Sequence, residues 1–340
     1  MKLNVSLLSL LSLALVGQAV AQAAPTRSLT LYSGRGRTFA EPIIQAFEKQ
    51  TGVKVNVRYG TDAQLVAAIR EEGSRSPADL YWGNSLGALG TLDADKKFLK
   101  LPAAVFRNVA PNYVPESQTW LPTTVRYRVL AYNTGKIKPE ALPQSVFDLP
   151  KLSALKGRIG WTLTYPSFQD FLGGMIATRG EAVTRQWLQD MKALEPKDYA
   201  TNNVGMLEAM RAGEIDVALT NHYYVQRVIR VGAPIETHFF RAGDIGNLGN
   251  ATGAAVLKTS RNSVNATRFL NYLVGKDAQT FFLSVNFEYP VTGNIIYPST
   301  LLPFSQVVER SPRVNPNTLP QYVEQAQRPL RALRLLRDPE

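Results

Sequence analysis

The sequence feature that most constrains the fold is an alternation of strand and helix patterns over residues 29–73. Two runs of alternating apolar residues are typical of strands, and each is followed by a helical pattern that ends near a glycine. We expect the first helix to begin with a capping box at Thr38 and Glu41, and the second with Asp62 as its cap. This order of elements predicts parallel βαβ units and therefore an α/β fold.

The chain begins with a segment of a different kind. Lys2 precedes an apolar run at 7–20, and Ala21-Gln22-Ala23 has the small-x-small pattern of a cleavage site. Residues 1–23 are therefore predicted to be a secretory signal peptide, and the mature chain, expected to begin at Ala24, to be periplasmic. No other stretch approaches the length needed to span a bilayer. The remaining length is typical of two domains.

Composition narrows the function classes. The chain has no cysteine, which excludes disulfides, thiolate metal sites and cysteine nucleophiles. Export without disulfides fits a bacterial periplasm. The formal net charge is +11, but the basic residues are scattered apart from the cluster at 328–337. The last twenty residues are expected to form a basic helix that packs across a lobe and not on a membrane. Because exported proteins rarely meet nucleic acid, we expect no nucleic-acid partner.

An apolar strand pattern at 215–220 runs directly into Asn221-His222-Tyr223-Tyr224. Ligands bind at the carboxyl ends of strands in open α/β sheets. Two neighbouring phenols at such a position can offer two phenolate oxygens to one hard cation. The alternative is structural: the two tyrosines open the next helix, with one packed inward and the other capping a surface.

The loop after the first predicted strand contains Gly34, Arg35, Gly36 and Arg37. Its two glycines resemble the start of a dinucleotide fingerprint, but Phe39 stands where the third glycine belongs, so a nucleotide site is not expected. A strand–loop–helix turn with two arginines and a helix N-terminus is a suitable seat for an anion. A solvated basic loop is the alternative.

Two later segments add predictions. A strand over 125–132 carries Arg126 and Arg128 on one face, where arginines usually pair with carboxylates. A glycine-rich loop is expected at 243–253, followed by a strand at 254–257.

Several short motifs in a fixed order resemble one protein family. They are Tyr32-Ser33-Gly34-Arg35, Ser76-Pro77-Ala78-Asp79, Arg126-x-Arg128-Val129 running to Tyr132-Asn133, Lys156-Gly157-Arg158-Ile159-Gly160-Trp161, Tyr199-Ala200-x-Asn202, Gly213-Glu214-Ile215-Asp216-Val217-Ala218-Leu219, Asn221-x-Tyr223-Tyr224 and Glu288-Tyr289-Pro290. The set resembles the bacterial periplasmic ferric-ion-binding proteins, or bacterial transferrins, that serve ABC importers.

The resemblance implies a two-lobe periplasmic-binding-protein fold, with hinge strands and a ligand cleft between two α/β lobes. Mapped onto this sequence, residues 29–126 plus 250–300 form lobe 1, and residues 127–249 plus 301–340 form lobe 2.

The same resemblance assigns metal ligands. Tyr223 and Tyr224 match the family's paired tyrosine ligands. Many members carry a histidine where this chain has Gly36 and a glutamate where it has Asn84, and neither substitute is a good ferric ligand. Some members recruit a further tyrosine from a loop that corresponds to the one holding Tyr165, so we expect Tyr165 as the third ligand. The alternative is an ordinary loop aromatic.

Three phenolates leave an octahedral ferric ion short of ligands, so a small synergistic anion such as carbonate, phosphate or a carboxylate is expected to complete the site. The residues expected to neutralise or hydrogen-bond this anion are Arg35, Arg37, Arg126, Ser167, Asn202 and Asn221.

The expected function is capture of ferric iron and its delivery, by a monomer, to an ABC transporter permease in the inner membrane. A binding protein for a small organic or phosphorylated anion, with tyrosines that only stack, is the alternative. No enzyme is expected, because the sequence shows no nucleophile elbow, no metalloprotease helix and no suitably spaced acidic pair. The two histidines, His222 and His238, are expected to be buried or solvated.

Overall fold

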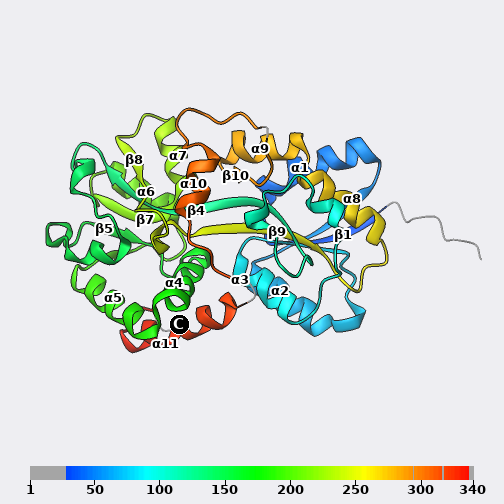
Figure 1. Cartoon of the computed structure of the whole chain (residues 1–340), viewed down its shortest axis with the longest axis horizontal. Coiled ribbons are helices and arrows are strands. Elements are labelled where there is room, and N and C mark those ends of the chain that lie inside the picture. The colour runs from blue at the N-terminus through cyan, green and yellow to red at the C-terminus, as the bar shows by residue number, and fades with distance from the viewer. Residues whose placement is uncertain (1–27, 294, 316–317, 337–340) are drawn as a thin grey trace, which may run out of the picture.

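The computed structural model describes residues 28–293, 295–315 and 318–336 (Figure 1). The predicted signal peptide at 1–23 lies outside these residues. The described part contains a ten-stranded mixed sheet with the path β2-β1-β3-β9-β4-β7-β5-β6, from which β8 and β10 also pair with β4. Helices surround both ends of this sheet, which confirms the predicted α/β class.

The first half of the molecule is built around the start of the chain. Strand β1 pairs in parallel with β2 and β3, and β9 connects β3 to the first part of β4 by antiparallel pairing. The elements of this half are β1 (Ser28–Ser33), α1 (Arg37–Thr51), β2 (Lys54–Tyr59), α2 (Asp62–Glu72), β3 (Leu80–Gly83), α3 (Leu86–Ala94), β9 (Gly249–Val256), α8 (Ser263–Leu273), α9 (Lys276–Asn286) and β10 (Tyr289–Pro290).

The second half is built around the other end of β4 (Leu121–Asn133). There β4 pairs antiparallel with β7 and β8, and β5 pairs in parallel with β7 and β6. The elements of this half are β5 (Ile159–Trp161), α4 (Pro166–Arg179), α5 (Glu181–Ala193), β6 (Lys197–Asp198), α6 (Asn203–Arg211), β7 (Val217–Asn221), α7 (His222–Arg230) and β8 (Ile235–His238).

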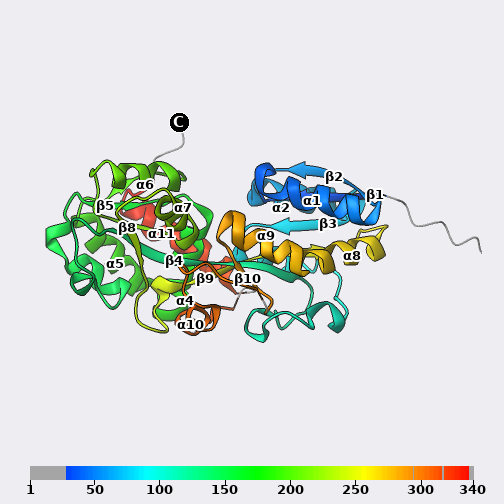
Figure 2. The ribbon, with the colours of Figure 1, turned by 90° about the horizontal axis from the view of Figure 1, so that it is seen from above.

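Strand β4 joins the two halves. All 13 of its residues are buried, and it passes from the core of the first half to the cores of the second between Tyr127 and Val129. Figure 2 shows α1, α2, α8 and α9 gathered with β1–β3 at one end, and α4–α7 gathered at the other. The molecule therefore has two α/β halves connected by the middle of a shared sheet.

The end of the chain is shared between the halves. In the segment with α10 (Phe304–Arg310) and α11 (Leu319–Ala332), Leu301, Val307 and Leu319 join the first core, whereas Ala326 and Leu330 join the second. The expected terminal helix is thus present up to Ala332 and packs on α4. The lobe boundaries drawn from the sequence stay a prediction.

Two predicted helix caps are wrong. Helix α1 begins at Arg37 with Gly36 as its N-cap, so Thr38 and Glu41 form no capping box. Helix α2 is capped by Thr61 instead of Asp62. The Asp62 carboxylate accepts the Tyr81 hydroxyl at 2.8 Å and the Asn84 backbone N–H at 3.0 Å.

None of the helices in the described ranges is long and apolar enough to cross a membrane.

Candidate metal centre

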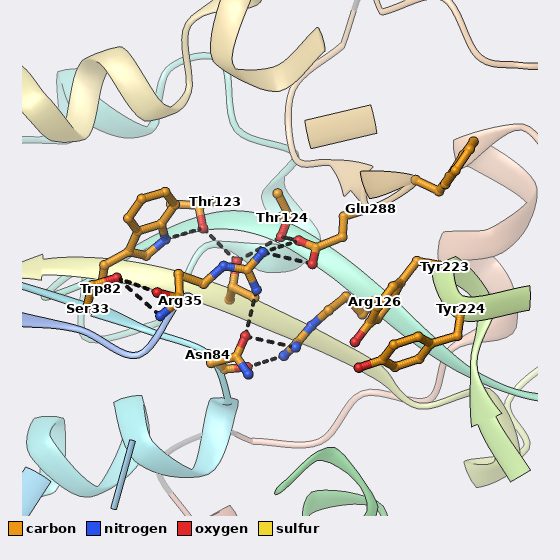
Figure 3. A network of polar contacts seen from close by, with 12 residues as sticks. Ser33, Arg35, Trp82, Asn84, Thr123, Thr124, Arg126, Tyr223, Tyr224 and Glu288 are labelled. Atoms are coloured by element: carbon orange, nitrogen blue, oxygen red, sulfur yellow. Dashed lines mark hydrogen bonds and ion pairs between the residues drawn. The ribbon is translucent and has the colours of Figure 1, made fainter. Parts of the chain in front are cut away.

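Three tyrosine hydroxyls converge at one point in the second half. The Tyr165 Oη lies 3.1 Å from the Tyr223 Oη and 3.2 Å from the Tyr224 Oη. The rings of Tyr223 and Tyr224 lie side by side with centroids 4.2 Å apart. Figure 3 shows the hydroxyls of Tyr223 and Tyr224 on the same side, toward the Arg126 guanidinium. Three phenol oxygens are therefore close enough to share one cation.

The local sequence explains this convergence. Strand β7 ends at Asn221 and α7 begins at the next residue, so Tyr223 and Tyr224 stand in the first helical turn at a strand end. Tyr165 is the N-cap of α4, whose first residue is Pro166, a proline where the missing N–H costs nothing. Neither N-cap side chain bonds its own helix, so N–H groups of both helix ends stay available to an anion.

Burial dominates the electrostatics of the paired tyrosines. It raises the pKa of Tyr223 well above the usual value, and the neighbouring phenols add to this while Arg126 opposes it. Burial likewise raises the pKa of Tyr224. Both side chains are therefore neutral phenols near neutral pH, and they become phenolates only when a cation replaces the protons.

The first half contributes a network of charged side chains (Figure 3). The Arg35 Nη2 donates to both carboxylate oxygens of Glu288, at 2.8 and 2.9 Å, and its Nη1 donates to the Asn84 Oδ1 at 2.6 Å. The Arg126 Nη1 donates to the same Asn84 oxygen at 3.1 Å. The Asn84 side-chain oxygen thus accepts two guanidinium hydrogen bonds, which leaves it poorly placed to bind a metal as well.

Gly36 is the second position at which many members of the family carry a metal ligand that this sequence lacks. A Cβ on Gly36 would meet no atom within 4 Å, so the position is open space at the start of α1.

Arg126 and Arg128 are almost completely buried, yet neither forms an ion pair with a carboxylate of the described residues. The expectation that they pair with carboxylates is wrong. The Arg128 Nη1 lies 3.4 Å from the Asn221 Oδ1, its Nη2 has no hydrogen-bond partner, and burial lowers its pKa to about 9. The Nε of Arg126 is also unpartnered. Two buried guanidinium groups thus lie near the tyrosines without a contact ion pair in the described residues, although the Glu288 carboxylate raises the pKa of Arg126 from a longer distance.

The remaining predicted anion-binding residues divide into two groups. The Asn221 amide donates to the Ser167 hydroxyl at 3.0 Å, so these two polar groups lie together at the N-termini of α7 and α4. Arg37 and Asn202 are engaged elsewhere. The Arg37 side chain is 72% exposed and pairs with Glu41 at 3.7 Å, while the Asn202 side chain caps α6.

Three residues near the tyrosines, Arg128, His222 and Glu288, are absent from the site residues predicted from the sequence. Glu288 stands between two buried aromatics, Phe287 and Tyr289. An acidic residue between apolar neighbours is the sequence feature that could have indicated a buried, paired carboxylate. Burial lowers the pKa of His222 to about 4, so its ring is neutral near neutral pH.

Within the described ranges, no group of three or more histidine and acidic side chains is arranged to hold a metal ion.

Comparison with known proteins identifies the family of this chain. Residues 32–280 match the family model described as bacterial extracellular solute-binding protein. The chain belongs to this family. This solute-binding protein is 34% identical over 315 residues to the major ferric iron-binding protein of Neisseria meningitidis serogroup B, which covers 90% of this chain and 93% of the relative. The resemblance to ferric-ion-binding proteins stated from the sequence motifs is confirmed.

Solved structures agree. The solute-binding protein is similar to iron-bound HitA from Pseudomonas aeruginosa, with a TM-score of 0.81, 32% identity and coverage of 90% of this chain and 99% of that one. It is also similar to a Trichodesmium protein (IdiA, FutA) in complex with iron and citrate, with a TM-score of 0.75, 25% identity and the same coverage. The predicted two-lobe periplasmic-binding-protein fold is thereby confirmed.

Proposed function

We propose that this protein captures ferric iron as its transported substrate through the phenolates of Tyr165, Tyr223 and Tyr224. The observation that carries the proposal is the convergence of the three hydroxyls, with Tyr165 at 3.1 and 3.2 Å from the other two. Ferric iron is a hard cation that prefers anionic oxygen ligands. The relatives and solved structures whose names mention iron support the same substrate.

A small synergistic anion, such as carbonate, phosphate or a carboxylate, completes the coordination in this proposal. Arg126 is its main cation, because Arg35 is already neutralised by Glu288. Ser167, Asn221 and the uncapped starts of α4 and α7 supply hydrogen-bond donors. Arg35 lies at the edge of the proposed anion site. Arg37 and Asn202 are not part of this site, because their side chains have other partners. The citrate of the Trichodesmium complex supports a carboxylate.

The proposal places the protein in the periplasm, after cleavage of the predicted signal peptide, as a monomer without enzymatic activity or nucleic-acid partner. It delivers iron to the permease of an ABC transporter in the inner membrane, as its solute-binding family implies.

An optical titration tests the proposal. The apo-protein is titrated with ferric ion, with and without carbonate, and phenolate–iron ligation should give an intense visible charge-transfer band. The Tyr223→Phe and Tyr224→Phe variants should each weaken the band and the affinity. The rival function, capture of an organic anion without a metal, requires anion binding that is independent of iron and produces no colour.

A further inference from the structure

Helix α7 carries the paired tyrosines, and it presents two other buried polar side chains four residues apart. His222 is 1% exposed and Gln226 is 3% exposed. Residues at positions i and i+4 of a helix lie on the same face. Neither side chain has a role in the proposed metal site, so their burial needs another explanation.

The partners of His222 determine its tautomer. The backbone N–H of Tyr127 donates to the His222 Nδ1 at 3.0 Å, so this nitrogen carries no proton. The Nε2 of the neutral ring must then be protonated, and it lies 2.7 Å from the Phe287 carbonyl oxygen, to which it donates. The ring also packs on Tyr289, with centroids 4.9 Å apart.

Gln226 makes an equivalent contact one turn later in α7. Its Nε2 donates to the Thr300 carbonyl oxygen at 3.1 Å, while its Oε1 has no partner. Both side chains thus donate to backbone carbonyls of a single stretch of chain, at 287 and 300.

These two hydrogen bonds connect different cores. Val225 and Val228 of α7 pack in a core of the second half, whereas Tyr289, Val291 and Leu301 pack in the core of the first half. The residue after Phe287 is Glu288, which holds Arg35. The helix that presents the tyrosines is therefore fastened to the segment that orders the arginine network of the other half.

We propose that His222 and Gln226 are positioning residues that latch α7 to the backbone carbonyls of Phe287 and Thr300 and keep the two halves in the arrangement that holds the cargo. This inference rests on the proposed function for its effect on iron. Separation of the halves would break one buried and one partly buried hydrogen bond, so the latch should slow iron release. It acts through the placement of Tyr223 and Tyr224 and makes no contact with the cargo itself.

The first test measures iron release from the loaded protein into excess EDTA, followed by loss of the visible band. Gln226→Met, which keeps the volume and removes the donor, should release iron roughly fivefold faster, the factor for one net hydrogen bond. His222→Leu combined with Gln226→Met should release it more than about tenfold faster. His222→Gln, whose amide can still donate to the Phe287 carbonyl, should be slower than His222→Leu.

Gln186→Met on the exposed face of α5 is the matched control and should leave release unchanged. A merely structural role predicts equal losses of Tm in the apo and loaded forms with normal release rates. That result would overturn the latch.

The second test needs no iron. Small-angle scattering of the apo-protein should give a larger radius of gyration for the double variant than for the wild type. Equal radii would overturn the latch whatever the iron data show. A larger radius of gyration in the double variant would support the latch even if the wild-type protein bound no ferric ion. In that case only the proposed function would be contradicted.

Discussion

The Arg35 Nη2 lies 2.8 and 2.9 Å from the two carboxylate oxygens of Glu288, and both side chains are 4% exposed. This buried ion pair uses the charge of the arginine that stands in the expected anion loop. Arg126 hydrogen-bonds only Asn84 among the described residues and forms no ion pair there, although the Glu288 carboxylate raises its pKa from a longer distance. Of the three arginines expected from the sequence to bind the anion, Arg126 is therefore the buried one that has no contact ion pair.

The first prediction concerns this ion pair. Glu288→Gln leaves Arg35 buried without a counter-charge and should lower the free energy of unfolding by about 3–5 kcal/mol, measured by urea denaturation of the apo-protein. Asp148→Asn, which breaks the exposed pair with Lys151, is the control and should cost at most about 1 kcal/mol. Equal losses in the two variants would show that Arg35 is not held by Glu288 in solution.

The second prediction concerns proton release by the tyrosines. If each bound phenol loses one proton, the logarithm of the apparent ferric affinity should rise by about three per pH unit in mildly acid to neutral solution. The raised pKa of Tyr223 and Tyr224 keeps them protonated in the apo-protein throughout this range, so binding weakens as pH falls. Chelator competition at a series of pH values, at constant anion concentration, measures the slope.

Tyr165→Phe should reduce that slope by about one and shift the visible band. Tyr59→Phe is the control, because the Tyr59 hydroxyl donates to Glu41 on α1 and is not among the converging hydroxyls. A Tyr165→Phe protein with the wild-type slope, colour and affinity would leave the metal on two tyrosines and exogenous anions.

The third prediction separates the arginines. Arg126→Met should weaken anion-assisted ferric binding at least tenfold, roughly the effect of one charge-assisted hydrogen bond. Arg37→Met should leave it unchanged, because that side chain is 72% exposed and pairs with Glu41. The measurement is the ferric affinity at increasing carbonate concentration. Similar losses of ferric affinity in Arg126→Met and Arg37→Met would indicate that the anion binds at the loop of Arg35 and Arg37 instead.

The sequence predicted the parts of the site that depend on strand ends. Tyr223 and Tyr224 follow β7 without an intervening loop, so the strand pattern alone places them at an edge of the sheet. Tyr165, which directly precedes α4, was expected there only from the resemblance to the ferric-ion-binding family. The pairing of Arg35 with Glu288 could not be predicted in the same way. The two residues are 253 positions apart, and only the packing of β10 beside β4 brings them together.

The glycine-rich segment shows a different limit of the sequence pattern. It was expected to be a loop up to residue 253, but β9 already begins at Gly249. A Cβ on Gly253 would lie 2.6 Å from the Trp120 side chain, and one on Gly249 would lie 2.9 Å from Tyr127. These glycines allow close approach of neighbouring side chains to a strand, and a single sequence does not distinguish that role from a turn.

The last prediction concerns Asp170 on α4. Its carboxylate accepts the Asn250 amide at 2.5 Å and the backbone N–H of Gly87 at the start of α3, so it joins the two halves. Burial raises the pKa of Asp170 from its ordinary 3.8 to about 7, with Arg126 opposing and Asp62 adding to the shift. Between these values the folded protein holds a proton that the unfolded chain has lost. The contribution of Asp170 to stability should therefore fall as pH rises from about 4 to about 7.

The Asp170→Asn variant carries no titrating group at this position, so it should lack this component of the pH dependence. The difference in unfolding free energy between variant and wild type should change by up to ~4 kcal/mol across the interval and level off above it. Urea denaturation of the apo-proteins at pH values from 4 to 8 measures it, and the shared titration of all other carboxyl groups cancels in the difference. Parallel curves for the two proteins would mean that Asp170 is ionised in the folded state throughout, and that the contact between α4 and α3 opens to water in solution.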